Sequence, residues 1–255
     1  MRKGAFCCIL AVMICCTLCG CSSSEQADGR AKVDALSNTS VEDVQSSIQA
    51  ERDRLNAEAE AEFAASFESK VVDDQLPREV ANEALSGVVL VGDSLIEAIS
   101  GYGILSSDHV VAEVGVSLYS AGPMISQAAQ LYPSNIVIAF GENDLDFNGA
   151  NSDAYIEALR TVVQQTRDEI PGARIFVASV LPVGDNAIAA DGNLAYWSDY
   201  NNALIAYANG ESDVTYIDTA EVGAAHQDML EPDGQHYTEA FYPYYLAKIG
   251  RVVFG

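Results

Sequence analysis

The sequence predicts an α/β domain of three layers, in which helices cover both faces of a doubly wound, mainly parallel sheet of five strands. Two observations support this fold class. First, short, continuously apolar, β-branched runs recur from Gly87 onward, as expected of parallel strands buried on both faces. Second, a helical stretch follows each run, and alternating strands and helices give a parallel sheet with right-handed crossovers. A chain of 255 residues suffices for one such domain and an appendage.

Five apolar runs are the expected strands. They are rich in valine and isoleucine, and turn-forming residues bound most of them. The carboxyl ends of all five strands would lie at one edge of the sheet, where α/β domains place their binding sites. The strands are expected at Val88–Val91, Val110–Val116, Ile136–Phe140, Arg174–Val180 and Val214–Ile217.

Helices are expected after the strands. The clearest is Ser152–Ile170, because its apolar residues recur on one face and Pro171-Gly172 ends it. Residues 183–196 are polar and contain glycine, and we expect a long loop there. Further helices are expected from Ser94 onward and over Pro123–Leu131, Trp197–Ala208 and Tyr242–Val253.

The N-terminus resembles the signal peptide of a bacterial lipoprotein. Arg2 and Lys3 precede the apolar run Ala5–Leu18, whose 14 residues are fewer than the roughly 20 of a membrane-spanning helix. Cys21 follows small residues and precedes three serines, as does the diacylated cysteine of a lipobox. We therefore expect residues 1–20 to be a signal peptide and Cys21 to be lipidated. The protein would be extracytoplasmic and lipid-anchored to the cell membrane; an uncleaved anchor and plain secretion are the alternatives.

Cysteine usage and charge exclude several kinds of site. All six cysteines lie at or before Cys21, so no disulfide framework, thiolate nucleophile or cysteine metal site is expected in the mature protein. The formal net charge is −24, and it becomes −26 when residues 1–20 are removed with Arg2 and Lys3. Such a surface repels nucleic acid and anionic lipid headgroups. We expect no nucleic-acid partner and a neutral or cationic substrate, although the acidity also maintains solubility.

Residues 21–80 are expected to form a tether and a stalk helix before the main domain, residues 81–255. The helix is expected over 40–70, where Thr39 and Glu42 form a capping-box pattern, and the alternative to a stalk is a helix that lies on the main domain through Phe63 and Phe67. Glutamates interrupt its apolar stripe, which disfavours a coiled coil, and we expect a monomer. The stripe comprises Val41, Val44, Ile48 and Leu55.

Four short motifs contain the groups that acyl transfer from an ester requires. Gly92-Asp93-Ser94, Gly115 and Gly141-Glu142-Asn143-Asp144 fall at or near the ends of three expected strands, and Asp233-Gly234-Gln235-His236 lies near the C-terminus. They supply a serine nucleophile, donors to an oxyanion, and a histidine base with a carboxylate. Each motif alone is a weak signal. Their occurrence together and in this order predicts one active site at the carboxyl edge of the sheet.

These motifs resemble those of the SGNH/GDSL hydrolase family, over roughly residues 86–255. The resemblance implies a flavodoxin-like fold and a serine esterase that uses no cofactor. Ser94 would be the nucleophile, and His236 would take its proton and return it to the leaving alcohol. Asp233 would orient the imidazole ring and stabilise its charged form.

The resemblance also implies an oxyanion hole. Its donors would be the backbone N–H groups of Ser94 and Gly115 and the side-chain amide of Asn143. Glycine suits position 115 because it tolerates unusual backbone dihedral angles and lets a substrate approach the backbone closely. The chain departs from the family pattern, without loss of a catalytic group, at Glu113, Glu142 and Gln235.

The remaining polar residues near the motifs have structural interpretations. Asp93 is expected to form the turn before Ser94, and Asp144 to brace its own loop. His109 precedes the second strand at the opposite end of the sheet, and His226 is expected at the surface, although it could line the site. Without a histidine pair at ligand spacing, no metal site is expected.

The expected substrate is a small ester or an acylated glycan, with O-acetyl groups on carbohydrate favoured. No long apolar lid occurs in the main domain, which disfavours a true lipase. Three alternatives remain: an O-acyltransferase to wall glycan, a lysophospholipase or thioesterase, and a non-catalytic glycan-binding lipoprotein. Aromatic candidates for contact with a sugar ring are Tyr119, Trp197, Tyr237 and Tyr242, although ordinary packing is favoured for several of them.

Overall fold

The computed structural model describes residues 40–255, apart from the side chain of Asn56. The expected signal peptide, the expected lipidation site Cys21 and most of the expected tether lie outside the described residues. The described residues divide into two units, 40–56 and 57–255. The four motifs all belong to the second unit.

Helix α2 (Val41–Glu68) agrees with the helix expected over 40–70. The Ser40 hydroxyl accepts a hydrogen bond from the Asp43 N–H at 3.0 Å and so caps the first turn. Thr39, the expected cap, lies outside the described residues. All four residues of the apolar stripe are exposed. Among residues 40–255, no helix has the length and apolar character needed to cross a membrane.

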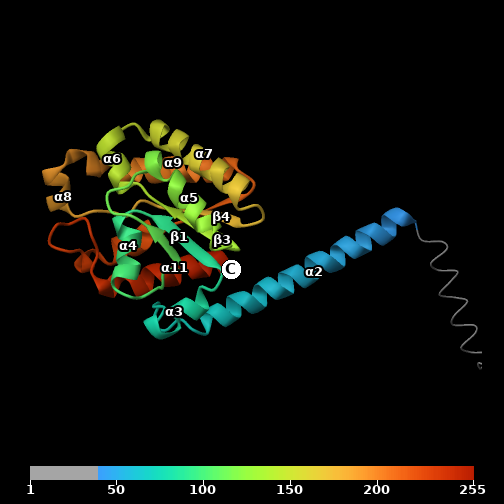
Figure 1. The fold of residues 1–255 in the computed structure, drawn as a ribbon. Coiled ribbons are helices and arrows are strands. Elements are labelled where there is room, and N and C mark those ends of the chain that lie inside the picture. The colour runs from blue at the N-terminus through green and yellow to red at the C-terminus, as the bar shows by residue number, and fades with distance from the viewer. Residues whose placement is uncertain (1–39) are drawn as a thin grey trace, which may run out of the picture. The chain divides into compact units, whose positions relative to one another are not determined.

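The second unit contains a five-stranded, all-parallel sheet, which confirms the expected fold class. The strand order is β2-β1-β3-β4-β5, so the chain starts inside the sheet, moves to one edge, and returns past β1 (Figure 1). The reversal of direction lies between β1 and β3, where open α/β sheets form their binding crevice. The strands are β1 (Val88–Gly92), β2 (Val110–Ala112), β3 (Asn135–Ala139), β4 (Arg174–Ala178) and β5 (Val214–Ile217).

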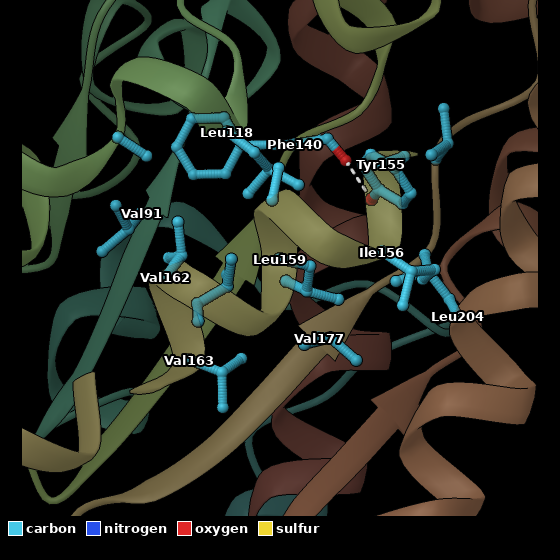
Figure 2. Close-up of a cluster of buried hydrophobic side chains, with 14 of the residues drawn as sticks. Val91, Leu118, Phe140, Tyr155, Ile156, Leu159, Val162, Val163, Val177 and Leu204 are labelled. Carbon is cyan, nitrogen blue, oxygen red and sulfur yellow. Dashed lines mark hydrogen bonds between the residues drawn. The ribbon is translucent and has the colours of Figure 1, made fainter. Parts of the chain in front are cut away.

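One face of the sheet is covered by α5 (Gly122–Ala129), α7 (Ser152–Glu169) and α9 (Trp197–Gly210). Figure 2 shows the core beneath them, in which Leu159 and Val162 from α7 lie among strand residues. The buried Tyr155 places its hydroxyl 3.0 Å from the Phe140 carbonyl and donates to it, so its polar end is satisfied inside the core.

The opposite face is covered by α3 (Arg78–Ala84), α4 (Ser94–Gly101) and α11 (Tyr242–Phe254). The C-terminal part of α2 joins this core through Phe67, whose side chain is 3% exposed. Its ring lies 5.4 Å from that of Phe254 and directly over the backbone of Gly250. The last turns of α2 therefore contribute to the core of the second unit.

Two segments differ from the sequence-based expectation. Strand β2 ends at Ala112 rather than Val116, because the chain leaves the sheet and reaches Gly115 with a φ of +77°. Residues 183–196 form two short helices instead of one loop. Helix α8 (Asp185–Ala190) is followed by η2 (Gly192–Tyr196), whose first turn is capped by the Asp191 carboxylate at 2.9 Å from the Asn193 N–H. The remaining elements are η1 (Leu118–Ser120), α6 (Glu142–Asn148), α10 (Ala220–Ala225), η3 (Gln227–Met229) and η4 (Glu239–Phe241).

Candidate active site

Ser94 lies where β1 turns into α4, at the carboxyl edge of the sheet. The Asp93 carboxylate accepts a hydrogen bond from the Leu95 N–H at 3.1 Å and caps the helix, as expected for a turn former. Only glycine fits at residue 92, because a Cβ there would collide with the Ala139 carbonyl and with Ile96. The motif thus holds the Ser94 side chain, which is partly exposed, at the first residue of the helix.

A chain of hydrogen bonds joins Ser94, His236 and Asp233. The Ser94 Oγ lies 3.1 Å from the His236 Nε2, and the His236 Nδ1 lies 2.8 Å from the Asp233 Oδ2. A proton on Nδ1, donated to Asp233, leaves Nε2 free to accept the serine proton. The other Asp233 oxygen accepts from the Gln235 N–H at 2.9 Å and the His236 N–H at 3.0 Å. One short loop therefore fixes both side chains.

This loop is itself tied to its surroundings. The Gly184 N–H donates to the Gly234 carbonyl at 2.7 Å, and Leu230 and Tyr237 form an isolated antiparallel bridge. The Tyr237 hydroxyl donates to the Pro182 carbonyl at 2.7 Å. Anchoring on both sides of the loop limits the movement of His236 relative to Ser94.

The structure brings the second and third motifs into contact. Asn143 lies in the first turn of α6, and its Nδ2 donates to the Val116 carbonyl at 3.2 Å, one residue beyond Gly115. The Asn143 amide is also near the Asp93 carboxyl, next to Ser94. Gly115 has open space where a Cβ would lie. All three residues expected in the oxyanion hole thus lie on neighbouring loops at one edge of the sheet.

Buried carboxyls surround the nucleophile. Asp93 is 1% exposed, and burial raises its pKa to about 6, although the hydrogen bond from Leu95 opposes this shift. Burial, reinforced by the charge on Asp93, raises the pKa of Glu142 to about 7. Both carboxyls line a cavity of about 20 Å³ beneath the site, together with Ser179 and Tyr245. This is room for one water molecule.

The charges around His236 favour its protonated form. Burial lowers the pKa of His236, but the hydrogen bond to Asp233 and the negative charges of Glu142, Asp233 and Asp93 outweigh it, so the pKa is raised. For Asp233, burial raises the pKa, but the Gln235 N–H and the bonds from His236 outweigh it, and the pKa is lowered. The ring can therefore gain a proton while Asp233 remains a carboxylate.

Asp144 braces the loop that follows β2. It is fully buried, and its Oδ1 accepts a hydrogen bond from the Leu118 N–H at 3.1 Å. The buried Tyr200 lies close by, with its hydroxyl 3.4 Å from the Asp144 carbonyl. The role expected from the sequence, bracing rather than reaction, agrees with these contacts.

The other two histidines contact residues outside the four motifs. His109 is buried at the amino end of β2, with its Nδ1 2.9 Å from the Val88 carbonyl. His226 is partly buried and its ring stacks 4.1 Å from that of Tyr244. Within residues 40–255, no three His, Cys, Asp or Glu side chains are grouped so that they could hold a metal ion.

The candidate sugar-contacting aromatics separate into two groups. Tyr237 and Tyr242 are buried in the core, at 0% and 1% exposure, in agreement with the packing interpretation. Trp197 packs partly against the core, whereas Tyr119 is exposed. Phe147 is also exposed and contacts Tyr119, and the sequence analysis missed it. An apolar residue four positions after Asn143, on a helix face with no core to meet, is the signal that could have indicated it.

Solved structures similar to this chain share its fold at low sequence identity. A carbohydrate esterase family 3 structure from Talaromyces cellulolyticus has a TM-score of 0.51 at 18% identity, covering 65% of this chain and 95% of that one. An acetyl esterase crystallised with an acetate ion has the same TM-score, identity and coverage. A GDSL-like lipase from Bacteroides thetaiotaomicron has a TM-score of 0.52 at 17% identity, covering 75% and 98%.

Sequence comparison identifies the family. A search of curated proteins finds no match to this chain. The sequence profile of the GDSL-like lipase/acylhydrolase family matches residues 57–243, a span that contains all four motifs and most of the chain. With its parallel sheet and its Ser94–His236–Asp233 chain of hydrogen bonds, this protein belongs to the GDSL-like lipase/acylhydrolase family.

Proposed function

We propose that this protein is a serine esterase that removes small acyl groups, chiefly O-acetyl groups, from carbohydrate. The observation that carries the proposal is the continuous chain of hydrogen bonds from the Ser94 hydroxyl through His236 to Asp233. A serine alone is almost wholly protonated at neutral pH and is a weak nucleophile. The neutral imidazole at 3.1 Å supplies the base that it needs.

In the first half of the reaction, the Ser94 Oγ attacks the ester carbonyl and its proton passes to the His236 Nε2. The carbonyl oxygen becomes an oxyanion, stabilised by the backbone N–H groups of Ser94 and Gly115 and by the Asn143 amide. His236 then protonates the leaving alcohol oxygen, the C–O bond to the alcohol breaks, and an acyl-Ser94 ester remains. Asp233 stabilises the imidazolium between these two steps.

In the second half, water replaces the alcohol. His236 takes a proton from the water as its oxygen attacks the acyl carbonyl, and the same donors stabilise the second oxyanion. The acid leaves when the bond to the Ser94 Oγ breaks and His236 returns the proton to that oxygen. No cofactor or metal enters either half of this scheme.

Two observations support a small, uncharged acyl group on a sugar. The loops at this edge of the sheet carry many carboxylates and no Lys or Arg, which disfavours anionic esters. Two of the solved structures with a similar fold are described as a carbohydrate esterase and an acetyl esterase.

We also propose, from the sequence, that the enzyme works outside the cytoplasm as a monomer anchored to the membrane through a lipid on Cys21. Two acyl chains on one residue would hold it there firmly, because each buried methylene contributes about 0.8 kcal/mol. Residues 21–80 would then separate the catalytic domain from the membrane. Metabolic labelling with an alkyne fatty acid tests this, since a Cys21→Ser variant should lose the label.

The esterase activity is tested with p-nitrophenyl acetate, butyrate and octanoate, on the wild type and on Ser94→Ala. A matched control is Ser106→Ala, which removes an exposed hydroxyl elsewhere in the domain. We expect acetate to be the best substrate, with turnover lost in Ser94→Ala and retained in Ser106→Ala. A preference for octanoate would favour a lysophospholipase or thioesterase. Equal rates for a folded Ser94→Ala would contradict a serine hydrolase altogether.

A further inference from the structure

We propose that Phe147 and Tyr119 form an aromatic platform beside the oxyanion loops, on which a sugar ring of the substrate stacks. The inference rests on the proposed function, because it names the part of the substrate that lies next to the reacting ester. It assigns the alcohol side of that ester to an uncharged pyranose rather than to a lipid or an acidic sugar.

The helix that presents Asn143 also presents Phe147. In α6 (Glu142–Asn148) these two residues are four positions apart, so they share one face and lie about 5–6 Å from each other along it. Asp144 and Leu145, which come between them in the sequence, are both fully buried. A group that reaches Asn143 at the nucleophile therefore has Phe147 as its neighbour one helical turn away.

Tyr119 completes the platform from the loop that carries Gly115. Its ring centroid lies 6.4 Å from that of Phe147, in an edge-to-face arrangement. Its hydroxyl donates to the Asn148 Oδ1 at 2.8 Å, and the Leu118 N–H is bound by Asp144. These contacts hold the Tyr119 ring against α6 without covering it.

Both rings are open to solvent. Phe147 is 72% exposed and Tyr119 57% exposed, and Val114, which immediately precedes Gly115, is 67% exposed. Exposed apolar side chains that are grouped in this way, rather than scattered singly, indicate a surface that a ligand covers. Phe147 lies in α6, the helix that carries Asn143, whereas Val114 and Tyr119 lie in the segment that carries Gly115. An aromatic pair of this kind offers an apolar face to the C–H groups of a sugar ring.

The polar groups beside the rings suit hydroxyls rather than an acyl chain or an anion. Asp146 is exposed and lies three positions after Asn143 on α6. Carboxylates accept hydrogen bonds from sugar hydroxyls. No Lys or Arg occurs in residues 113–121, 140–152, 179–196 or 218–241. A lipid tail would desolvate these carboxylates, and a uronic acid would be repelled by them.

The direct test is binding without turnover. Isothermal titration of Ser94→Ala with xylohexaose, a neutral oligosaccharide, should give saturable binding, and hexagalacturonate, its anionic counterpart, should bind at least about ten-fold more weakly. Adding Phe147→Ala should weaken xylohexaose binding about three- to ten-fold, and Phe147→Trp should restore it. Tyr132→Ala is the matched control, because Tyr132 is 89% exposed and lies at the opposite edge of the sheet.

Turnover gives a second readout. In the active enzyme, which retains Ser94, Phe147→Ala should reduce the ratio of kcat/KM for acetylated xylo-oligosaccharide to kcat/KM for p-nitrophenyl acetate by about the same three- to ten-fold factor. The platform is contradicted if xylohexaose does not bind, if Phe147→Ala and Tyr132→Ala bind it equally, or if Phe147→Ala instead selectively impairs octanoate hydrolysis. Because titration needs no reaction, failure of the platform is distinguishable from failure of the esterase, which Ser94→Ala tests alone.

Discussion

Asp144 couples the stability of this fold to pH, and its replacement by asparagine is expected to remove part of that dependence. The carboxyl is fully buried, and burial raises its pKa from 3.8 to about 7. The folded protein therefore binds this proton more tightly than the unfolded chain does. The free energy of unfolding falls as the pH rises from about 4 to about 7, and this contribution is constant at higher pH.

The size of the effect follows from the two pKa values. Between pH 5 and pH 8, the difference in proton binding reduces the free energy of unfolding by about 2–3 kcal/mol, at roughly 1.4 kcal/mol per pKa unit. Asp144→Asn keeps an oxygen that can accept from the Leu118 N–H but cannot become charged. Between pH 5 and pH 8, the free energy of unfolding of the variant should therefore fall by about 2–3 kcal/mol less than that of the wild type.

Urea unfolding at pH 5, 6.5 and 8 gives the slope of the free energy of unfolding against pH for each protein. The slope isolates Asp144, because every other titrating group is common to both proteins. The control is Asp199→Asn, which neutralises an exposed carboxylate in the first turn of α9 and should leave the slope close to that of the wild type. If wild type and Asp144→Asn lose stability in parallel, the raised pKa of Asp144 is refuted.

Three further predictions concern the site and the core. Asn143→Ala should lower kcat about 10²–10³-fold with little change in Tm, because it removes one oxyanion donor; full activity would exclude that role. Glu142→Gln removes a negative charge that raises the pKa of His236. Because the base acts when neutral, the acidic limb of the kcat/KM profile should move to lower pH, and an upward shift would contradict this. Phe67→Ala should reduce the free energy of unfolding by about 3–5 kcal/mol, whereas Phe63→Ala, at an exposed residue of the same helix, should change it little; equal effects would show that Phe67 is not part of the core.

The sheet could be predicted from the sequence because parallel strands buried on both faces must be apolar at every position. Strands β1 and β3 have all five residues buried, and apart from the first residue of β3, Asn135, each appears as an apolar run around Leu90 or Val137. Strand β2 was overestimated for a related reason. Val114 and Val116 continue the apolar pattern, but the backbone turns at Gly115, and a pattern of side chains does not report that turn.

The site could be predicted because its chemistry depends on a few residue types held by short-range geometry. Asp233 and His236 are three positions apart and contact each other directly, and the Asp93 carboxylate caps the helix that begins at Ser94. The aromatic residues could not be assigned in this way. The hydroxyl of the buried Tyr237 donates a hydrogen bond to the Pro182 carbonyl, 55 positions earlier in the sequence. The residues around Tyr237 in the sequence do not indicate so distant a partner.

The central claim is that Ser94 is the nucleophile activated by His236, and covalent labelling tests it most directly. A fluorophosphonate should react with the Ser94 Oγ, with loss of fluoride and transfer of the serine proton to His236. Intact-mass analysis should show one adduct per chain, and peptide mapping should place it on Ser94. Labelling should disappear in Ser94→Ala and in His236→Ala and persist in Ser106→Ala. An adduct on another residue, or undiminished labelling of Ser94→Ala, would contradict the account.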